Sequence, residues 1–309
     1  MRNEYYSHSK VKTWRACHKL YDYKYEQGLI RKTSPAALLR GTVFHEMLDN
    51  RVLGKDPYEP LVEYGKIYDK LWDEERENYP SPEDLTRLYV RYCQHYANET
   101  LDYKGMSETE IITEYQGIKF KGILDKQPRD KFGREFVMDH KTHKVIPDEN
   151  HRFADLQTVL YYWAKKQNGD KVDGIIWDYI RTKPPTVPEL LKSGGLSKRA
   201  NIDSDYDTYL GEIEKRNLDP RDYSDILEKL KKNTFFKRIV LPGPSPELVD
   251  NVVEEFFTTA REIESSTSKS RNMTRNCSSC SYFQLCQAEV RGLDSEFIRK
   301  QMFTLREEK

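Results

Sequence analysis

Two aspartates and a lysine are spaced so that a β-hairpin could bring them together. Segment 117–144, GIKFKGILDKQPRDKFGREFVMDHKTHK, has two runs rich in Ile, Phe and Val around a Pro-, Asp- and Gly-containing stretch. These residue types are typical of strands and of the turn that joins them. If the turn centres on Phe132, Asp125 lies opposite Asp139, on the same face of the sheet. Lys141 follows Asp139 by two residues, so it points to that face as well.

Two carboxylates and an ammonium group on one face can form a site for a hard metal ion. Oxygen ligands suit Mg²⁺ or Mn²⁺. Such an ion can bridge a phosphodiester oxygen and lower the pKa of a bound water. Lys141 could orient that water or stabilise the negative charge that develops during cleavage. A surface hairpin with an ordinary Asp–Lys pair is the simpler alternative.

An imidazole could add a nitrogen ligand to this site. In the predicted helix LLRGTVFHEML, His45 shares a stripe with Leu38, Gly41, Leu48 and Val52. The glycine one turn earlier permits a close approach of another chain segment. His45 is therefore either a ligand of the same metal or a core histidine whose hydrogen bonds are satisfied.

Three more polar residues could support the site. Gln157 and Tyr161, in DLQTVLYYWA, are four residues apart and lie on one helix face. They could position a phosphate or a nucleotide, or they could pack and hydrogen-bond. Glu114, near the end of a predicted strand, is either an outer ligand or a solvated carboxylate.

The cysteines suggest a second site. The chain has five: Cys17, Cys93, Cys277, Cys280 and Cys286. An odd number without a visible signal peptide argues against a disulfide framework and for a reducing compartment. The C-x2-C-x5-C cluster near the C-terminus can converge on one soft metal centre. Cys93 lies beside the apolar stripe of a predicted helix, where we expect it to pack, so Cys17 is the preferred fourth ligand.

These side chains need a framework of helices and strands. Apolar periodicity predicts helices at 7–26, 36–53, 60–78, 82–103, 153–168, 206–216, 221–232 and 246–265. Strands are predicted at 108–115, 117–126, 135–142, 172–181 and 235–241. Strands followed by a helix and another strand indicate an α/β core.

Composition excludes several classes of protein. The 309 residues include 51 Lys and Arg and 51 Asp and Glu, so the formal net charge is zero and a nonspecific polycation is excluded. With 21 Tyr and 12 Phe a disordered chain is not expected. No apolar run is long enough for a membrane span, and the start MRNEYYSHSK has no apolar signal segment. We expect a cytoplasmic protein without a membrane partner.

Six motifs in order resemble a known nuclease family. They are Cys17, Gly41-x3-His45, Gly122-x2-Asp125, Asp139-x-Lys141, Gln157-x3-Tyr161 and Cys277-x2-Cys280-x5-Cys286. This order resembles the RecB-type branch of the PD-(D/E)XK nucleases. The split cysteines are similar to its iron–sulfur subgroup, which includes the AddB nuclease domain and the CRISPR-associated Cas-four family. The stretch TKPPTVPELLKSGGLSKR is also similar to stand-alone phage-encoded exonucleases.

The resemblance implies roles for these residues. His45, Asp125, Asp139 and the backbone carbonyl of His140 would bind Mg²⁺ or Mn²⁺. Asp125, Asp139 and Lys141 would be catalytic, and Gln157 and Tyr161 would lie along the DNA. The four cysteines Cys17, Cys277, Cys280 and Cys286 would hold a [4Fe–4S] cluster. Zn²⁺ is the alternative occupant, because sites of four cysteines suit it too.

The resemblance also implies a fold and a division of the chain. We expect one nuclease domain over 1–309 with a restriction-endonuclease-like core, in which helices flank a mixed central sheet. Within it we expect a helical segment at 55–106, a loop and helical insertion at 183–234, and a cysteine module at 267–290 joined to Cys17.

The expected activity is hydrolysis of phosphodiester bonds in DNA, by an exonuclease acting on duplex ends or single strands. The biological role would lie in phage recombination, repair or DNA processing, in a bacterium or an infected cell. A nuclease-fold accessory subunit that binds DNA without cutting it is the alternative. Protein partners are compatible with either activity.

Overall fold

Three small sheets and the helices around them make up the described part of the chain. The computed structural model describes residues 4–103, 107–148 and 156–306. The strands are β1 (Leu29–Arg31), β2 (Thr109–Tyr115), β3 (Ile118–Leu124), β4 (Phe136–His143), β5 (Gly174–Arg181), β6 (Phe236–Pro242) and β7 (Phe303–Leu305). The α-helices are α1 (His8–Ala16), α2 (His18–Tyr21), α3 (Ala36–Val52), α4 (Glu59–Tyr68), α5 (Asp73–Arg76), α6 (Pro82–His95), α8 (Gln157–Gln167), α9 (Tyr206–Lys215), α10 (Ser224–Leu230), α11 (Pro246–Ser265), α12 (Phe283–Arg291) and α13 (Ser295–Met302). A π-helix, η1 (Asp22–Glu26), and two 3₁₀ turns, η2 (Pro220–Tyr223) and η3 (Arg275–Ser279), complete the described elements.

The central sheet is mixed and has the strand order β4-β5-β6. β4 runs parallel to β5, with Met138 opposite Ile176, whereas β6 runs antiparallel to β5. Five consecutive residues of β4, Phe136 to His140, are buried. This fits a strand that is covered on both faces, as strands in parallel pairs usually are. The α/β class predicted from the sequence is therefore confirmed.

β2 and β3 form an antiparallel hairpin beside this sheet. Its two-residue turn has positive φ at Gln116 (51°) and Gly117 (80°), as a type I′ turn requires. The predicted pairing of 117–126 with 135–142 is therefore only partly correct, since β3 forms its ladder with β2. β3 and β4 approach through an isolated bridge between Lys126 and Met138, which has the register expected from a turn at Phe132.

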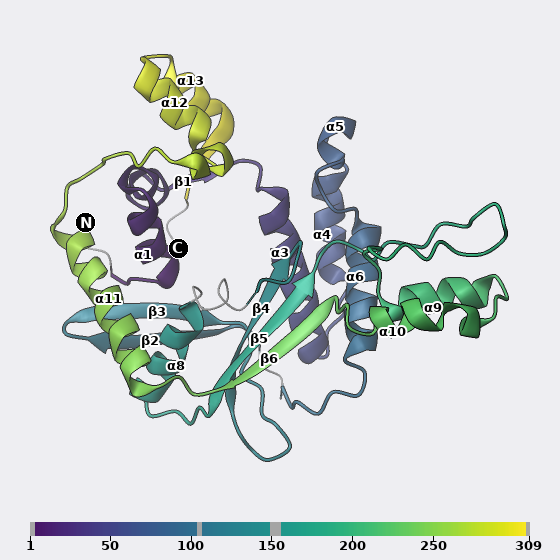
Figure 1. Cartoon of the computed structure of the whole chain (residues 1–309). Coiled ribbons are helices and arrows are strands. Elements are labelled where there is room, and N and C mark those ends of the chain that lie inside the picture. Colours follow the sequence, from purple (N-terminus) through teal and green to yellow (C-terminus); the bar gives the residue numbers. More distant parts are fainter. Residues whose placement is uncertain (1–3, 104–106, 149–155, 307–309) are drawn as a thin grey trace.

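Helices cover the sheets in two groups (Figure 1). On one side α1, α8 and α11 pack on the β2–β3 hairpin, in a core that includes Trp14, Phe120 and Phe257. On the other side α3, α4 and α6 form a second core against β5 and β6, which includes Phe44 and Phe236. The candidate catalytic residues lie where these two groups meet.

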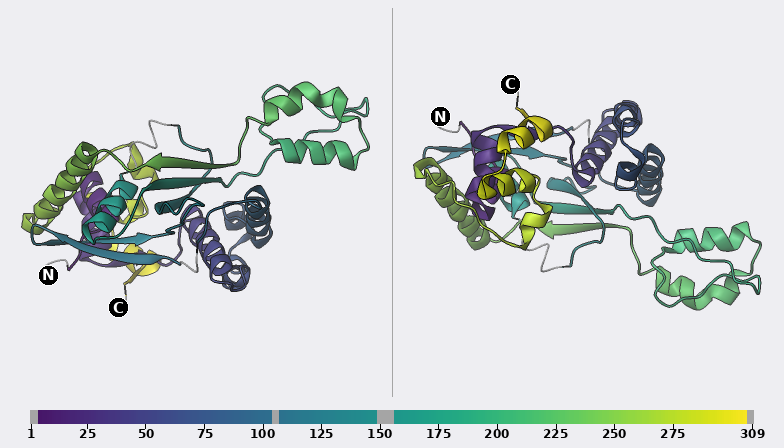
Figure 2. Two further views of the ribbon diagram at one scale, coloured as in Figure 1. Left: turned by 90° about the horizontal axis from the view of Figure 1, so that it is seen from below. Right: turned by 90° about the horizontal axis from the view of Figure 1, so that it is seen from above.

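α9 and α10 project from the ends of β5 and β6, as both views of Figure 2 show. They lie within the predicted insertion 183–234 and have a small core of their own, built around Tyr209, Ile213, Tyr223 and Leu227. This core explains how a segment outside the main sheets keeps a defined structure.

Several predicted elements differ from the observed ones. The predicted helix 7–26 is broken at Cys17, which has an extended backbone (φ −169°, ψ 119°). The predicted helix 60–78 is two helices, α4 and α5, and the first residues of the predicted helix 153–168 lie outside the described residues. The sequence analysis missed α12, α13 and the short pair β1–β7. No helix among the described residues combines the length and the apolar character needed to cross a bilayer.

Candidate active site

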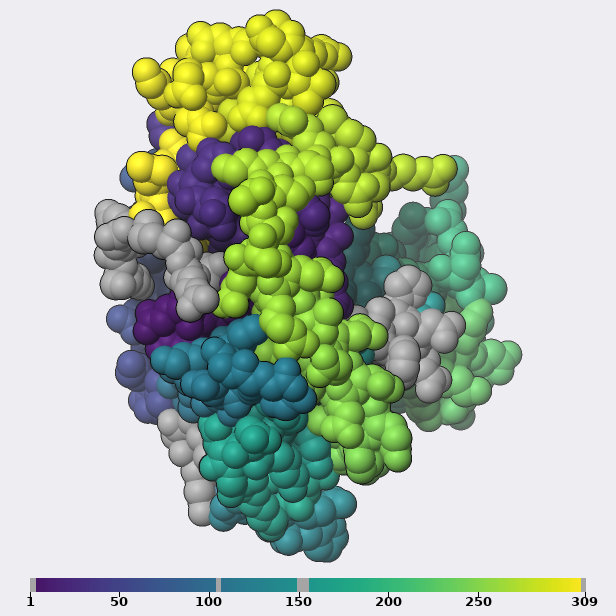
Figure 3. Space-filling view, turned by 90° about the vertical axis from the view of Figure 1, so that its left-hand side faces the viewer, coloured from purple at the N-terminus to yellow at the C-terminus, as the bar shows by residue number. Residues whose placement is uncertain are grey.

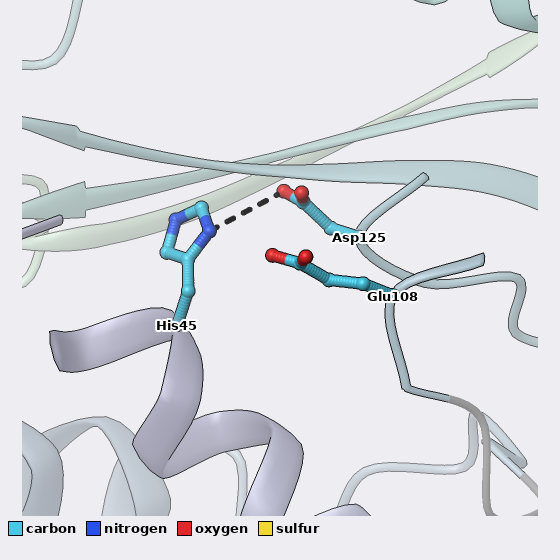
Figure 4. A group of neighbouring side chains, drawn as sticks. All are labelled: His45, Glu108 and Asp125. Carbon is cyan, nitrogen blue, oxygen red and sulfur yellow. Dashed lines mark ion pairs between the residues drawn. The ribbon is translucent and has the colours of Figure 1, made fainter. Parts of the chain in front are cut away.

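Asp125 and His45 meet beyond the end of β3. Asp125 directly follows β3, and His45 projects from α3 so that its Nδ1 lies 3.7 Å from Asp125 Oδ2 (Figure 4). The same carboxylate oxygen accepts a hydrogen bond of 2.8 Å from the backbone N–H of His140. The predicted stripe of His45 is wrong at Leu38, which is 63% exposed, because α3 buries the face that carries Phe44 and Met47. His45 therefore lies at the edge of the buried face, where its imidazole can approach Asp125.

Glu108 is a third member of this group, and the sequence analysis missed it. One ligand atom from each of His45, Glu108 and Asp125 lies within 4.8 Å of the others (Figure 4). The register that pairs Thr109 with Leu124 puts Glu108 opposite Asp125. Pairing 108–115 with 117–126 through the Gln116–Gly117 turn would have identified it from the sequence.

The electrostatics of this group fit a divalent cation. Burial lowers the pKa of His45 to about 4, so at neutral pH the imidazole is uncharged and available as a ligand. Burial raises the pKa of Glu108, and the nearby charge of Asp125 raises it further. The two carboxylates are hard oxygen donors suited to Mg²⁺ or Mn²⁺, and the neutral imidazole adds a borderline nitrogen donor.

Asp139 and Lys141 are neighbours on β4, as the sequence predicted. Asp139 Oδ2 lies 2.8 Å from Lys141 Nζ, and the Asp139 side chain is only 5% exposed. Asp139 is not part of the group of three formed by His45, Glu108 and Asp125. Its role as a metal ligand thus stays a prediction, as does that of the His140 carbonyl.

Gln157 and Tyr161 extend this arrangement onto α8. Lys141 Nζ donates a hydrogen bond of 3.1 Å to Gln157 Oε1, and Gln157 Nε2 donates one of 2.6 Å to Tyr161 OH. Tyr161 is buried, and burial raises its pKa to about 12. Gln157 and Tyr161 therefore orient Lys141. A contact of Gln157 or Tyr161 with the substrate stays a prediction.

Two glycines of the predicted motifs allow these close approaches. A Cβ atom on Gly122 would lie 2.4 Å from Cε1 of Tyr161, so a side chain on β3 would displace that ring. A Cβ atom on Gly41 would lie 3.3 Å from Thr142 Oγ1, where α3 crosses β4. Gly122 thus permits Tyr161 to lie against the hairpin, and Gly41 permits α3 to approach β4.

His140 connects the site to a buried polar network. Its Nδ1 lies 2.7 Å from Asp178 Oδ2 on the neighbouring strand β5. Asp178 is fully buried and also accepts hydrogen bonds from Tyr92 and Arg238. Burial alone would raise the pKa of Asp178, but the hydrogen bond from His140 and the charge of Arg238 outweigh it and lower that pKa.

The four predicted cysteine ligands line one cavity. Cys17, Cys277, Cys280 and Cys286 surround a volume of about 400 Å³, between the N-terminal helices and the segment that leads to α12. Burial raises the pKa of Cys280, and the other three cysteines raise it further. Cys93 lies apart on α6, where Arg51 donates a hydrogen bond of 2.8 Å to its Sγ.

Residues 270–272 form hydrogen bonds with backbone groups on both sides of the helix break at Cys17. Lys19 N–H donates to the carbonyl of Ser270 (2.9 Å), and Asn272 Nδ2 donates to the carbonyl of Ala16 (3.0 Å). The backbone N–H of Asn272 lies 3.5 Å from Cys17 Sγ. Figure 3 shows this part of the chain lying across the N-terminal helices. Cys17 therefore leaves the predicted helical stripe and faces the cavity.

Comparisons with known proteins come from sequence families and from solved structures. A provisionally assigned exonuclease from Eubacterium rectale is 14% identical with a TM-score of 0.49, over 89% of this chain and 86% of that one. The structure of SSO0001 is 13% identical with a TM-score of 0.32, over 81% and 95% of the two chains. No curated protein matches the sequence. The family model of the PD-(D/E)XK nuclease superfamily matches residues 5–287, and the chain therefore belongs to this superfamily.

Proposed function

We propose that this protein is a Mg²⁺- or Mn²⁺-dependent deoxyribonuclease that hydrolyses phosphodiester bonds at DNA ends or in single strands. The superfamily implies a nucleic-acid substrate. The observation that carries the proposal is the convergence of His45, Glu108 and Asp125 beside the Asp139–Lys141 pair. Carboxylate oxygens that can hold a divalent ion next to an ammonium group are an arrangement that supports phosphodiester hydrolysis.

Each group has a distinct part in the proposed reaction. His45, Glu108 and Asp125 would hold the divalent ion, with Asp139 as a further ligand. When bound, the ion lowers the pKa of a coordinated water and polarises a phosphodiester oxygen. Lys141 donates hydrogen bonds to the attacking water or to the oxygens that gain negative charge. Gln157 fixes the direction of this ammonium group.

The test uses end-labelled single-stranded and duplex DNA with Mg²⁺ or Mn²⁺. Asp139→Ala and Lys141→Ala should each lower the cleavage rate by at least about 100-fold, the usual effect of losing one aligned charged group. Lys131→Ala, which removes an exposed lysine from a turn, is the matched control and should cleave as the parent does. Fragment lengths over time distinguish exonucleolytic from endonucleolytic cleavage.

Two results would contradict the proposal. One is cleavage that persists in both the Asp139→Ala and Lys141→Ala variants. The other is a parent protein that cleaves no DNA with either metal. If that inactive parent still binds DNA, the alternative of a non-cleaving accessory subunit gains support.

We also propose that Cys17, Cys277, Cys280 and Cys286 hold a [4Fe–4S] cluster, as in the iron–sulfur subgroup of RecB-type nucleases. Four cysteine donors around one cavity fit a soft metal centre, and the resemblance to the iron–sulfur subgroup favours a cluster over one zinc ion. The cluster would crosslink the N-terminal helices to the 267–290 module of a single nuclease domain. Such a crosslink stabilises a fold mainly by restricting its unfolded chain.

Anaerobic purification tests the cluster. The parent should be coloured and should contain iron and sulfide, whereas Cys17→Ser should lose the colour and about 2–4 kcal/mol of stability, as when a long crosslink is removed. Cys93→Ser is the matched control and should keep the iron. A colourless parent with stoichiometric zinc would overturn the cluster and leave the nuclease proposal intact.

A further inference from the structure

We propose that a cleft between α3, α6 and the start of the insertion binds the phosphate backbone of a single DNA strand next to the active site. This inference rests on the proposed nuclease function and names where the substrate strand runs. It also gives a function to residues 182–187, which lead from β5 into the insertion.

The cleft has the size and charge for this ligand. Its volume is about 660 Å³, within the range of pockets that hold drug-sized ligands. That size suits one or two nucleotides of a single strand. Two acidic residues, Glu77 and Asp84, also line it. The basic side chains that line it are Arg40, Arg87, Arg91, Lys144 and Lys183.

Three of these basic groups already have carboxylate partners. Arg87 pairs with Asp84 along α6. Arg91 pairs with Asp205 at 2.5 Å, which ties α6 to the insertion, and Lys183 pairs with Asp203 at 2.9 Å. The cleft is therefore formed before any ligand binds, and the charges of these pairs are largely neutralised.

Arg40 is the group that points to an anionic ligand. Its guanidinium is half-buried, and it donates a hydrogen bond of 3.3 Å to the neutral hydroxyl of Thr182. Within the described residues Arg40 forms no ion pair, and the Asp84 carboxylate that acts on it electrostatically is already paired with Arg87. Placing a cation out of water is costly unless an anion compensates it. Lys144, the other cation in the cleft without a described ion pair, is exposed at the end of β4. A backbone phosphate between Arg40 and Lys144 would satisfy both.

The cleft adjoins the active site through two elements. Arg40 directly precedes Gly41, which lies against Thr142, and His45 is on the same helix. Lys144 follows Lys141 by three residues at the end of β4, where Thr182 N–H donates to the carbonyl of His143 (2.9 Å). The cleft is therefore built on α3 and on the end of β4, the same two elements that carry His45 and Lys141.

Binding can be measured without cleavage. A fluorescein-labelled single-stranded oligothymidylate is titrated in EDTA at several NaCl concentrations, and fluorescence anisotropy gives Kd. Arg40→Gln/Lys144→Gln should raise Kd roughly tenfold and reduce the slope of log K against log[salt] by about 1.4, since each lost phosphate contact removes ~0.7. Arg40→Lys/Lys144→Arg keeps both charges and should keep the slope. The control Lys55→Gln/Lys131→Gln removes two exposed lysines elsewhere and should bind as the parent does.

A second measurement separates binding from folding. Because Arg40 forms no ion pair within the described residues, Arg40→Gln should leave Tm unchanged or raise it. An unchanged Kd and slope in Arg40→Gln/Lys144→Gln, or a parent that binds no single strand, would overturn the cleft. If Arg40→Gln/Lys144→Gln loses affinity for a duplex of the same length by an equal factor, the proposal that the cleft binds a single strand is overturned. The proposed nuclease fails separately, by absence of cleavage in Mg²⁺ and Mn²⁺, while the EDTA measurement still reports on the cleft.

Discussion

The imidazole Nδ1 of His140 lies 2.7 Å from Oδ2 of Asp178, while the backbone N–H of His140 donates to Asp125. One residue of β4 thus connects the candidate metal site to a carboxylate that is completely buried beneath it. Arg238 Nε also donates to Asp178, at 3.1 Å. Asp178 is therefore a positioning residue: it fixes His140, which in turn holds the carboxylate of Asp125.

Asp178→Asn should lower both stability and metal affinity. It leaves the buried Arg238 without one of its carboxylates, a change that typically costs about 3–5 kcal/mol of unfolding free energy. Losing a residue that orients a ligand typically weakens metal binding by about 10- to 100-fold. Urea unfolding and Mn²⁺ titration measure the two effects. Tyr92→Phe removes one hydrogen bond to the same carboxylate and should cost less, about 1.5–3 kcal/mol. Unchanged Mn²⁺ affinity in a folded Asp178→Asn protein would show that Asp178 contributes to stability and not to metal binding.

Gly122→Ala should disturb the position of Lys141 indirectly, through Tyr161 and Gln157. The new Cβ would overlap the ring of Tyr161, and overpacking of this kind costs about 1–3 kcal/mol. Displacing Tyr161 releases Gln157 and then Lys141, so the cleavage rate should fall as well. Gly211→Ala is the control: it lies on α9 with no atom near the added Cβ, and should gain about 0.5–1 kcal/mol. If the clash is the cause, the losses from Gly122→Ala and Tyr161→Ala will not add in the double variant.

Glu108→Gln should weaken binding of the divalent ion and should not destabilise the metal-free protein. Removing one of two neighbouring carboxylates relieves their repulsion, so Tm in EDTA should stay the same or rise. Mn²⁺ affinity should fall at least about tenfold, and Mn²⁺ should raise Tm by less than in the parent. Glu114→Gln is the matched control, because Glu114 is exposed on β2, the strand that follows Glu108, and is not part of the group of three. Equal Mn²⁺ affinity in the two variants would show that Glu108 is not a ligand of the divalent ion.

Asp203 should contribute stability that depends on pH. Hydrogen bonds from Arg181 and then Lys183 lower its pKa to about 2, against roughly 3.9 in an unfolded chain. A lowered pKa in the folded state means that the contribution is complete above about pH 4 and is lost as the pH falls toward 2. Asp203→Asn should therefore lower Tm at pH 7 and progressively less between pH 4 and pH 3. Asp250→Asn, an exposed position on α11, should show no such trend. A Tm difference that is constant with pH would contradict the assignment.

The sequence alone determined much of the framework. Apolar periodicity predicted α11 with its observed bounds, because that helix buries one regular face. The run of strand-forming residues predicted β4 to within one residue, because five consecutive residues of it are buried. The spacing of Asp139 and Lys141 predicted their contact, since residues two apart on a strand share a face. A turn at Phe132 predicted the register of the Lys126–Met138 bridge.

Only the tertiary structure decided the rest, because it depends on segments distant in sequence. Glu108 joins His45 and Asp125 through the pairing of β2 with β3 and the packing of α3. Cys17 leaves its helix because residues 270–272 satisfy the backbone groups that the break exposes. The Gln116–Gly117 turn could have placed Glu108 opposite Asp125, but local periodicity contains no information about the packing of α3 or about residues 270–272. Neither the approach of His45 to the two carboxylates nor the orientation of Cys17 could therefore be predicted from it.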